Sequence, residues 1–118
     1  MRPAEESRSD VDADFERGLD LIERGEYFAA HEALEEAWRA AANEERDFFQ
    51  GLVHVAVAWY QAGRGNQVGC ERQLEKAARR LSPYAPVHRA VDVADLLTRV
   101  RAAQRAFPVL PPARVRRT

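Results

Sequence analysis

The chain has 118 residues and one cysteine, and its hydrophobic (46%) and charged (31%) fractions are those of an ordinary single globular domain. A net charge of −1 gives no general field to attract nucleic acid or an anionic membrane, and a lone Cys70 excludes an internal disulfide. No apolar stretch approaches the roughly 18–20 residues of a membrane span, and Met1–Asp10 lacks the apolar core of a signal peptide, so we expect a cytoplasmic protein.

Residues 1–9 are charged and carry no apolar pattern, which predicts a disordered segment ahead of a single domain at 10–106. Within that domain, apolar residues recur at helical spacing, and glycine, asparagine or aspartate marks the ends of the periodic stretches. The pattern predicts five helices, over Val11–Arg24, Glu26–Ala42, Glu44–Ala62, Gln67–Leu81 and from Asp92 to about Arg105. The third is apolar on nearly every side, which is typical of a central, buried helix.

Two segments are expected to lack helix. Pro83 and Pro86 make Ser82–Val91 a connection, because the residue before a proline is biased away from the helical conformation. The tail at 107–118 contains three prolines and three arginines, and we expect it to fray or to pack loosely.

A weak internal repeat bears on the arrangement of the helices. The segment Arg24–Arg39 resembles Arg64–Arg79, including an Arg-Gly pair at the start and a Leu-Glu pair further on. Two helical hairpins in series produce such a pattern. We therefore predict an all-α single domain, with two antiparallel helical hairpins in series and a fifth helix packed across them.

One face of the second predicted helix carries polar side chains among apolar ones. His31 and Glu35 are spaced i, i+4 and share this face with Trp38, so we expect the pair to face the core or a crevice. Gln50 and His54 repeat the spacing on the third helix.

The turn near Asn43 makes the second and third helices antiparallel neighbours. In that arrangement Glu35 lies opposite His54, and His31 lies near Val57. Arg46 reaches Glu35 or Glu36 only across a tight turn.

Three interpretations of this cluster remain open. His31, Glu35 and His54 are residue types that bind a divalent metal such as zinc, with Gln50 or water completing the shell. Without a metal, the same groups suit general acid–base chemistry, although the second to fourth helices contain no serine or threonine to act as a nucleophile. In the third interpretation the cluster is structural, with Glu35 paired to a histidine or arginine and Trp38 donating its indole N–H to Gln50.

The residues around this helix resemble a known family. The run Gly25-Glu-Tyr27-Phe-Ala-Ala-His31-Glu32-Ala-Leu34-Glu35-Glu-Ala-Trp38 resembles the signature of the bacterial and archaeal family DUF309. Further matches are Arg46, Gln50-Gly51-Leu52, Gly65-Asn66 with Gly69, and Asp92 ahead of Leu96-Leu97. The resemblance covers about residues 11–105 and implies a small all-helical domain to which no activity is assigned. Carried over to this chain, the family pattern falls on His31, Glu32, Glu35, Trp38, Arg46 and Gln50.

We therefore predict a non-catalytic domain that binds a protein or a small-molecule ligand through the cluster His31/Glu35/Arg46/Gln50. The alternative is a metal-binding protein or metal-dependent hydrolase that uses His31, Glu35 and His54, so whether the chain is an enzyme stays open. We expect no nucleic-acid or membrane partner. A homodimer would cover the apolar surface that Trp59 and Tyr60 supply.

Overall fold

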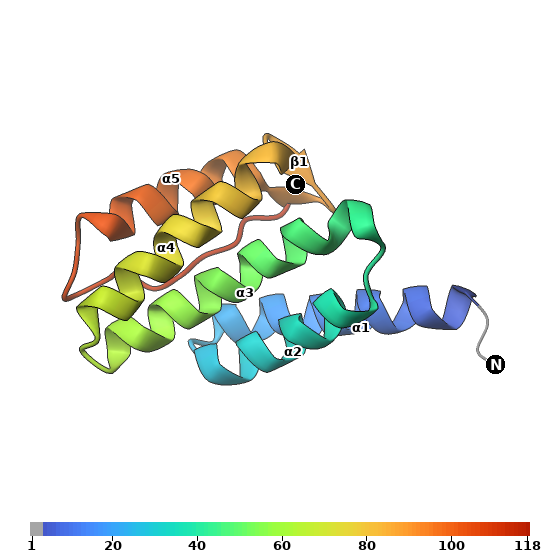
Figure 1. Ribbon diagram of the computed structural model, residues 1–118, viewed down its shortest axis with the longest axis horizontal. Helices are drawn as coiled ribbons and strands as arrows, with labels where there is room; N and C mark the ends of the chain where they lie inside the picture. The colour runs from blue at the N-terminus through green and yellow to red at the C-terminus, as the bar shows by residue number, and fades with distance from the viewer. Residues whose placement is uncertain (1–3) are drawn as a thin grey trace.

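The computed structural model describes residues 4–118, in which the chain is mostly helical (Figure 1). Its helices are α1 (Ala4–Glu23), α2 (Tyr27–Ala40), α3 (Asn43–Gly63), α4 (Gln67–Leu81) and α5 (Val93–Gln104). Between α4 and α5 lie a single 3-10 turn, η1 (Ser82–Tyr84), and two antiparallel strands, β1 (Val87–His88) and β2 (Val91–Asp92). The all-α prediction therefore holds for most of the chain, and this small two-stranded sheet departs from it.

The first helix begins at Ala4, well before the predicted start at Val11. Of the segment predicted to be disordered, Met1–Pro3 lie outside the described residues, and the backbone of Ala4–Ser9 continues α1. Alanine and glutamate, which occupy positions 4–6, are residue types of high intrinsic helix propensity. The prediction relied on apolar periodicity, which this end of the helix lacks.

Local signals set most of the other helix ends. Gly25 and Gly65 adopt positive φ angles of 77° and 74°, a conformation that glycine reaches without steric cost, and each follows a helix. Asn66 caps α4 by accepting a hydrogen bond from the N–H of Gly69, and Asp92 caps α5 by accepting one from the N–H of Asp95. The predicted stop at Gly25 and the predicted cap at Asp92 are confirmed.

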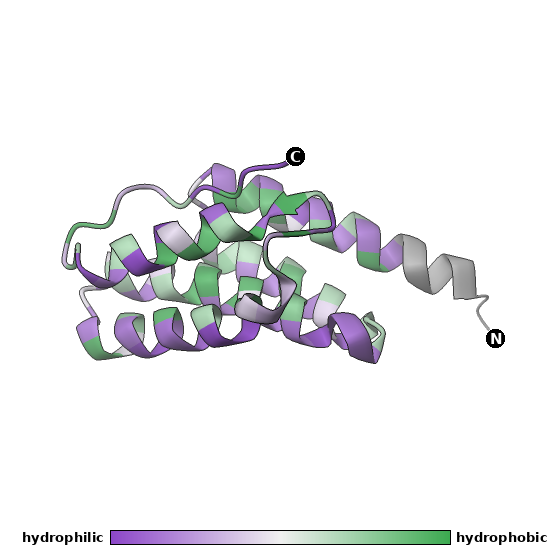
Figure 2. Cartoon of the chain, turned by 90° about the horizontal axis from the view of Figure 1, so that it is seen from above, coloured by the Kyte–Doolittle hydropathy of each residue, from purple (hydrophilic) through white to green (hydrophobic). Residues whose placement is uncertain are grey.

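The core is built around α3, as its apolar sequence predicts. Each helix packs against the next along the chain, and α3 runs between α2 and α4 (Figure 1). Phe48, Phe49 and Leu52 of α3 are fully buried. Figure 2 shows bands of hydrophobic and hydrophilic residues along the helices, the pattern of amphipathic helices that bury one side. Among residues 4–118, no helix combines the length and the apolar character that crossing a bilayer requires.

The C-terminal segment, residues 107–118, packs against the domain, so the prediction of a loose tail was wrong. Ala113 and Val115 are buried, and the carbonyl of Arg116 accepts a hydrogen bond from the N–H of Asp92. Figure 1 shows the segment running back from the end of α5 to finish beside β1. Only two of its side chains, those of Ala113 and Val115, are buried, and an alternation of two residues is too short to be detected in a sequence. We call residues 107–118 the C-terminal strap.

Candidate functional site

The central helix α3 reaches solvent along one stripe. The partly exposed residues of this stripe recur at helical spacing and are Arg46, Gln50, His54, Val57 and Gln61. On one side the stripe is flanked by His31, Glu35 and Trp38 of α2, and on the other by Gln73 of α4. We call the surface formed by these nine residues the α3 face.

The His31/Glu35 pair lies at the edge of the α3 face, and neither side chain is buried in the core. The Nε2 atom of His31 is 3.4 Å from Oε1 of Glu35, and the two side chains are 20% and 36% exposed. The His31 Nδ1–H donates to the carbonyl of Phe28 at 2.9 Å, which turns Nε2 toward the carboxylate. Glu35 also lies 3.8 Å from Arg39. Of the two places expected for the pair, the core or a crevice, the geometry matches the crevice, because His31 lines a small cavity with Val57 and Tyr60.

The other predicted cluster residues of α2 and α3 form one contact, between Trp38 and Arg46. The guanidinium of Arg46 lies 4.5 Å from the ring centroid of Trp38 in a cation–π geometry, and it does not make the contact with Glu35 or Glu36 that a tight turn would allow. The expected hydrogen bond from Trp38 to Gln50 does not occur, and Gln50 lies one helical turn beyond Arg46 on the same stripe. Glu32 is exposed, and no polar contact of its side chain occurs within residues 4–118.

His54 faces α4, away from the His31/Glu35 pair. Its Nδ1 atom lies 2.7 Å from Oε1 of Gln73. Burial lowers the pKa of His54, the hydrogen bond to Gln73 opposes that effect, and nearby cations of α4 lower the pKa further. In the part of the chain that the structure describes, no three His, Cys, Asp or Glu side chains gather closely enough to hold a metal ion. The geometry therefore does not bring His31, Glu35 and His54 together as a metal site.

Aromatic side chains adjoin the end of the α3 face that lies nearest the N-terminus of α4. Phe28 is 51% exposed, and its ring centroid lies 5.0 Å from that of His31 and 5.3 Å from that of Tyr60. These three residues line a cavity of about 190 Å3 with Val57 and Gln61. An open groove of about 670 Å3 adjoins it, and we call the part lined by Tyr27, Phe28, Trp59 and Tyr60 the aromatic groove.

The comparison with known proteins decides the family. Residues 15–73 match DUF309, described as a domain of unknown function, and these residues are half of the chain. The chain belongs to the DUF309 family. The matched segment contains every residue of the α3 face, and it confirms the resemblance over residues 15–73.

One curated relative of this DUF309 chain is also found. The uncharacterized protein YpuF of Bacillus subtilis (strain 168) is 35% identical over 68 residues, which are 57% of this chain and 37% of YpuF. The chain thus spans little more than a third of the length of this relative.

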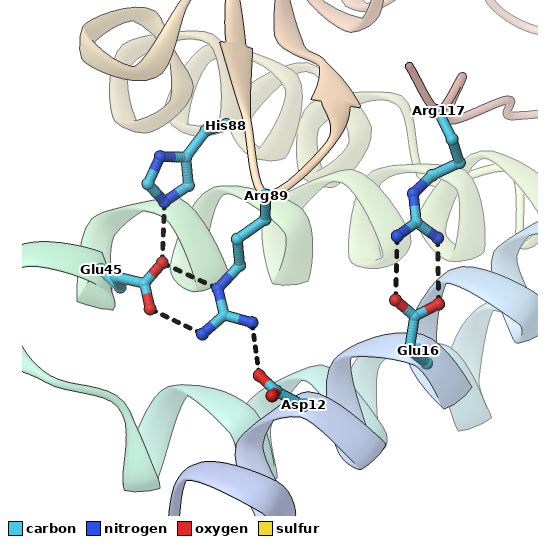
Figure 3. A network of polar contacts seen from close by, with 6 residues as sticks. All are labelled: Asp12, Glu16, Glu45, His88, Arg89 and Arg117. Atoms are coloured by element: carbon cyan, nitrogen blue, oxygen red, sulfur yellow. Dashed lines mark hydrogen bonds and ion pairs between the residues drawn. The ribbon is translucent and has the colours of Figure 1, made fainter.

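A second polar cluster lies in this DUF309 chain, partly outside the matched segment (Figure 3). Arg89, in the turn between β1 and β2, donates two hydrogen bonds to Glu45 of α3 and one to Asp12 of α1, each at 2.7 Å. His88 lies 2.8 Å from the same Glu45 carboxylate, and Arg117 of the strap forms a two-point ion pair with Glu16. The hydrogen bonds from Arg89 hold the pKa of Glu45 below its usual value, against the opposing effect of burial.

Sequence reasoning missed this cluster. The partners of Arg89 lie 44 and 77 positions away in the chain, so no local spacing could indicate them. Arg89 and Ala90 also adopt positive φ angles of 48° and 60°, which non-glycine residues rarely do. Because the polar groups pair with one another and link α1, α3 and the hairpin, we interpret the cluster as structural.

Proposed function

We propose that this DUF309 chain is a non-catalytic protein-binding domain and that the α3 face is its contact surface. The observation that carries the proposal is the presence of large aromatic side chains at both ends of the solvent-facing stripe of α3. Trp38, covered by Arg46, stands at one end, and Phe28 with Tyr60 stands at the other. Aromatic residues and arginine are enriched at protein–protein interfaces, where they dominate the binding energy.

The shape of the face favours a protein over a small molecule. The cavity beside His31 holds about 190 Å3, less than the roughly 300–1,000 Å3 of usual small-molecule sites, and the larger groove beside it is open along the surface and does not enclose a ligand. The rest of the face consists of polar side chains along a helix, such as Gln50 and His54. A partner that lies along the stripe would use the aromatic ends as anchors and the glutamines, the His31/Glu35 pair and Arg46 for polar contacts.

Three finer properties complete the proposal. We infer a cytoplasmic location from the single cysteine, which leaves no internal disulfide of the kind that secreted domains use. We infer two antiparallel hairpins in series from the packing of α1 on α2 and of α3 on α4, with α5 on α4. A second copy of the chain is one candidate partner, with Phe28 and Tyr60 at the contact. Trp59 cannot supply this surface, because the strap leaves it only 6% exposed.

Site-specific photo-cross-linking in the native host tests the proposal. A photoreactive phenylalanine analogue replaces Gln50 on the α3 face or, as a control, the exposed Arg101 on α5. We expect a discrete cross-linked species from position 50 and none from position 101. Adding the substitution Trp38→Ala should abolish the cross-linked species from position 50, because it removes a proposed aromatic anchor and adds no group that could block the partner. Equal cross-linking from both positions, or none from either, would contradict the proposal.

A further inference from the structure

The aromatic groove remains open on the side of Phe28 and Tyr60. Phe28 is half exposed, and the guanidinium of Arg64 lies 5.6 Å from the ring centroid of Tyr60, extending the flat surface. Gly25 and Gly63 add no side chain there, and the space where their Cβ atoms would stand is free of other atoms within 4 Å. The groove is therefore lined by aromatic rings and, beside them, by the backbone of two glycines, where no side chain blocks access.

The chain places a proline-containing segment of its own against the same rings. The indole N–H of Trp59 donates to the carbonyl of Pro111 at 2.7 Å, and the Tyr27 hydroxyl accepts a hydrogen bond from the N–H of Ala113 at 3.2 Å. This strap segment carries prolines at 108, 111 and 112. Pro108 lies in a turn that is closed by the hydrogen bond from the N–H of Val109 to the carbonyl of Ala106, and Pro111 and Pro112 follow after that turn.

The site of the strap and the open groove are parts of one surface. A cavity of about 720 Å3 lies between the strap and the helices, and it shares Gly25, Tyr27, Trp59 and Gly63 with the aromatic groove. The strap therefore occupies one flank of the Tyr27/Trp59 pair, while the flank toward Phe28 and Tyr60 is unoccupied.

These features match one class of ligand. Proline-rich segments dock into aromatic-lined grooves, where proline rings pack on the ring faces and tryptophan or tyrosine side chains bond to the exposed carbonyls. Such segments are already extended before binding, so they lose little conformational entropy on an open, shallow surface.

We propose that the aromatic groove binds a proline-rich, extended segment of a partner protein, with the rings of Phe28 and Tyr60 as the contact surface. On the adjoining flank, the side chains of Trp59 and Tyr27 already form hydrogen bonds with the backbone of a proline-containing segment. The inference rests on the proposed function, because it names the chemistry of a partner that would meet the aromatic end of the α3 face.

The test is a titration of the full chain with a synthetic peptide that repeats Pro-Val-Leu-Pro-Pro twice, followed by 1H–15N correlation spectra. A second peptide carries alanine in place of every proline. We expect the proline peptide alone to shift the amide signals of Phe28, Tyr60 and Arg64. Phe28→Ala should weaken binding about tenfold, since a central aromatic contact is lost. Val68→Ala is the matched control: Val68 is 57% exposed and does not line the groove, so the Kd should stay unchanged.

Three outcomes would overturn the inference: no shifts up to the solubility limit of the peptide, equal shifts with the alanine peptide, or shifts confined to Ala113–Arg117. The last would mean that the peptide displaces the strap and leaves the open flank empty. Cross-linking from position 50 without peptide binding would reject the proline chemistry while the proposed function stands. Peptide binding at Phe28 without cross-linking from position 50 would instead reject the α3 face as the contact surface for a partner protein.

Discussion

Arg89 joins three parts of the molecule through one side chain. Its guanidinium binds Glu45 at two points and Asp12 at one, and it lies 5.4 Å and 5.1 Å from the ring centroids of Phe15 and Phe49. These contacts hold the hairpin turn in its left-handed conformation, which is sustained only where the surroundings determine it. The side chain is 20% exposed, so the charges are partly shielded from solvent.

We expect Arg89→Gln to lower the free energy of unfolding by about 2 kcal/mol, because it leaves the partly buried Glu45 without its main partner. Urea denaturation at neutral pH measures the loss. The control is Arg99→Gln, which breaks a one-turn surface pair with Asp95 and should cost about 0.5 kcal/mol or less. Equal losses in the two variants would show that the cluster contributes no more than a surface ion pair.

His54 makes the stability depend on pH, because burial lowers its pKa in the folded chain below the ordinary value of 6.5. Between the folded and unfolded pKa values the unfolded chain binds more protons, so stability rises with pH in that window. We therefore expect stability to be fully present above about pH 6.5 and to fall as the pH drops below it.

Urea titrations at about pH 7.5 and pH 5.5 measure this slope. His54→Gln should flatten it, because the titrating group is gone. Gln73→Met should steepen it, since the hydrogen bond that raises the pKa of His54 is lost. An unchanged slope in His54→Gln would assign the pH dependence to other groups.

Two glycines set how closely neighbouring helices approach. A Cβ atom at Gly18 of α1 would lie 2.5 Å from Cγ of Leu34, and one at Gly51 of α3 would lie 2.6 Å from Cγ of Leu81. Both leucines are fully buried and have no free space to move into. The α1–α2 and α3–α4 contacts therefore depend on the missing side chains.

Gly51→Ala should destabilise the chain by about 1–3 kcal/mol despite the better helix propensity of alanine, because α3 and α4 must separate. Gly63→Ala is the matched control in the same helix. Nothing lies within 4 Å of its added Cβ, so thermal unfolding should show an unchanged or slightly higher Tm. A loss of similar size at both positions would contradict close packing as the cause.

The helices were the most predictable elements because their signals are local. The prediction Gln67–Leu81 coincides with α4, and the predicted bounds of α2 and α3 differ from the observed ones by one or two residues. The strands β1 and β2 were missed: each has two residues, and β2 pairs onward with the strap, where Val91 forms a bridge with Arg117. Short strands that depend on a distant partner carry no periodic signal of their own.

The candidate site was predictable in outline and not in its contacts. The i, i+4 spacing correctly joined His31 to Glu35, because one helix determines that distance. Pairing across helices was predictable only in part. His31 lies beside Val57 as expected, but His54 turns to Gln73, and Arg46 meets Trp38. Small rotations of a helix decide such pairings, and a sequence does not reveal them.

At the scale of the whole molecule, the strap connects the end of the chain to its first helix. Arg114 pairs with Glu23 and Arg117 with Glu16, so basic residues of the strap lie along acidic residues of α1. The N–H of Val115 also donates to Glu23, and the N–H of Thr118 donates to the carbonyl of Ala90. The strap thereby links α1 to the β1–β2 hairpin and to the buried Trp59 of α3.

A charge placed under the strap should therefore destabilise the whole domain. We expect Val115→Asp to cost about 3 kcal/mol, because the buried side chain becomes an unpaired charge. Val109→Asp, at a strap position that is 80% exposed, should leave the urea midpoint unchanged. If both variants behave like the parent chain, the strap is not part of the cooperative unit.

The central claim is that a partner protein covers the α3 face, and hydroxyl-radical footprinting tests it at the level of side chains. Oxidation of Phe28, Trp38 and Tyr60 is compared between the purified chain and the chain in living host cells, with the partly exposed Tyr84 as an internal reference away from the face. We predict that these three side chains are oxidised readily in the purified chain and are protected in cells, while Tyr84 reacts equally in both. Equal oxidation of all four residues in the two states would contradict the claim.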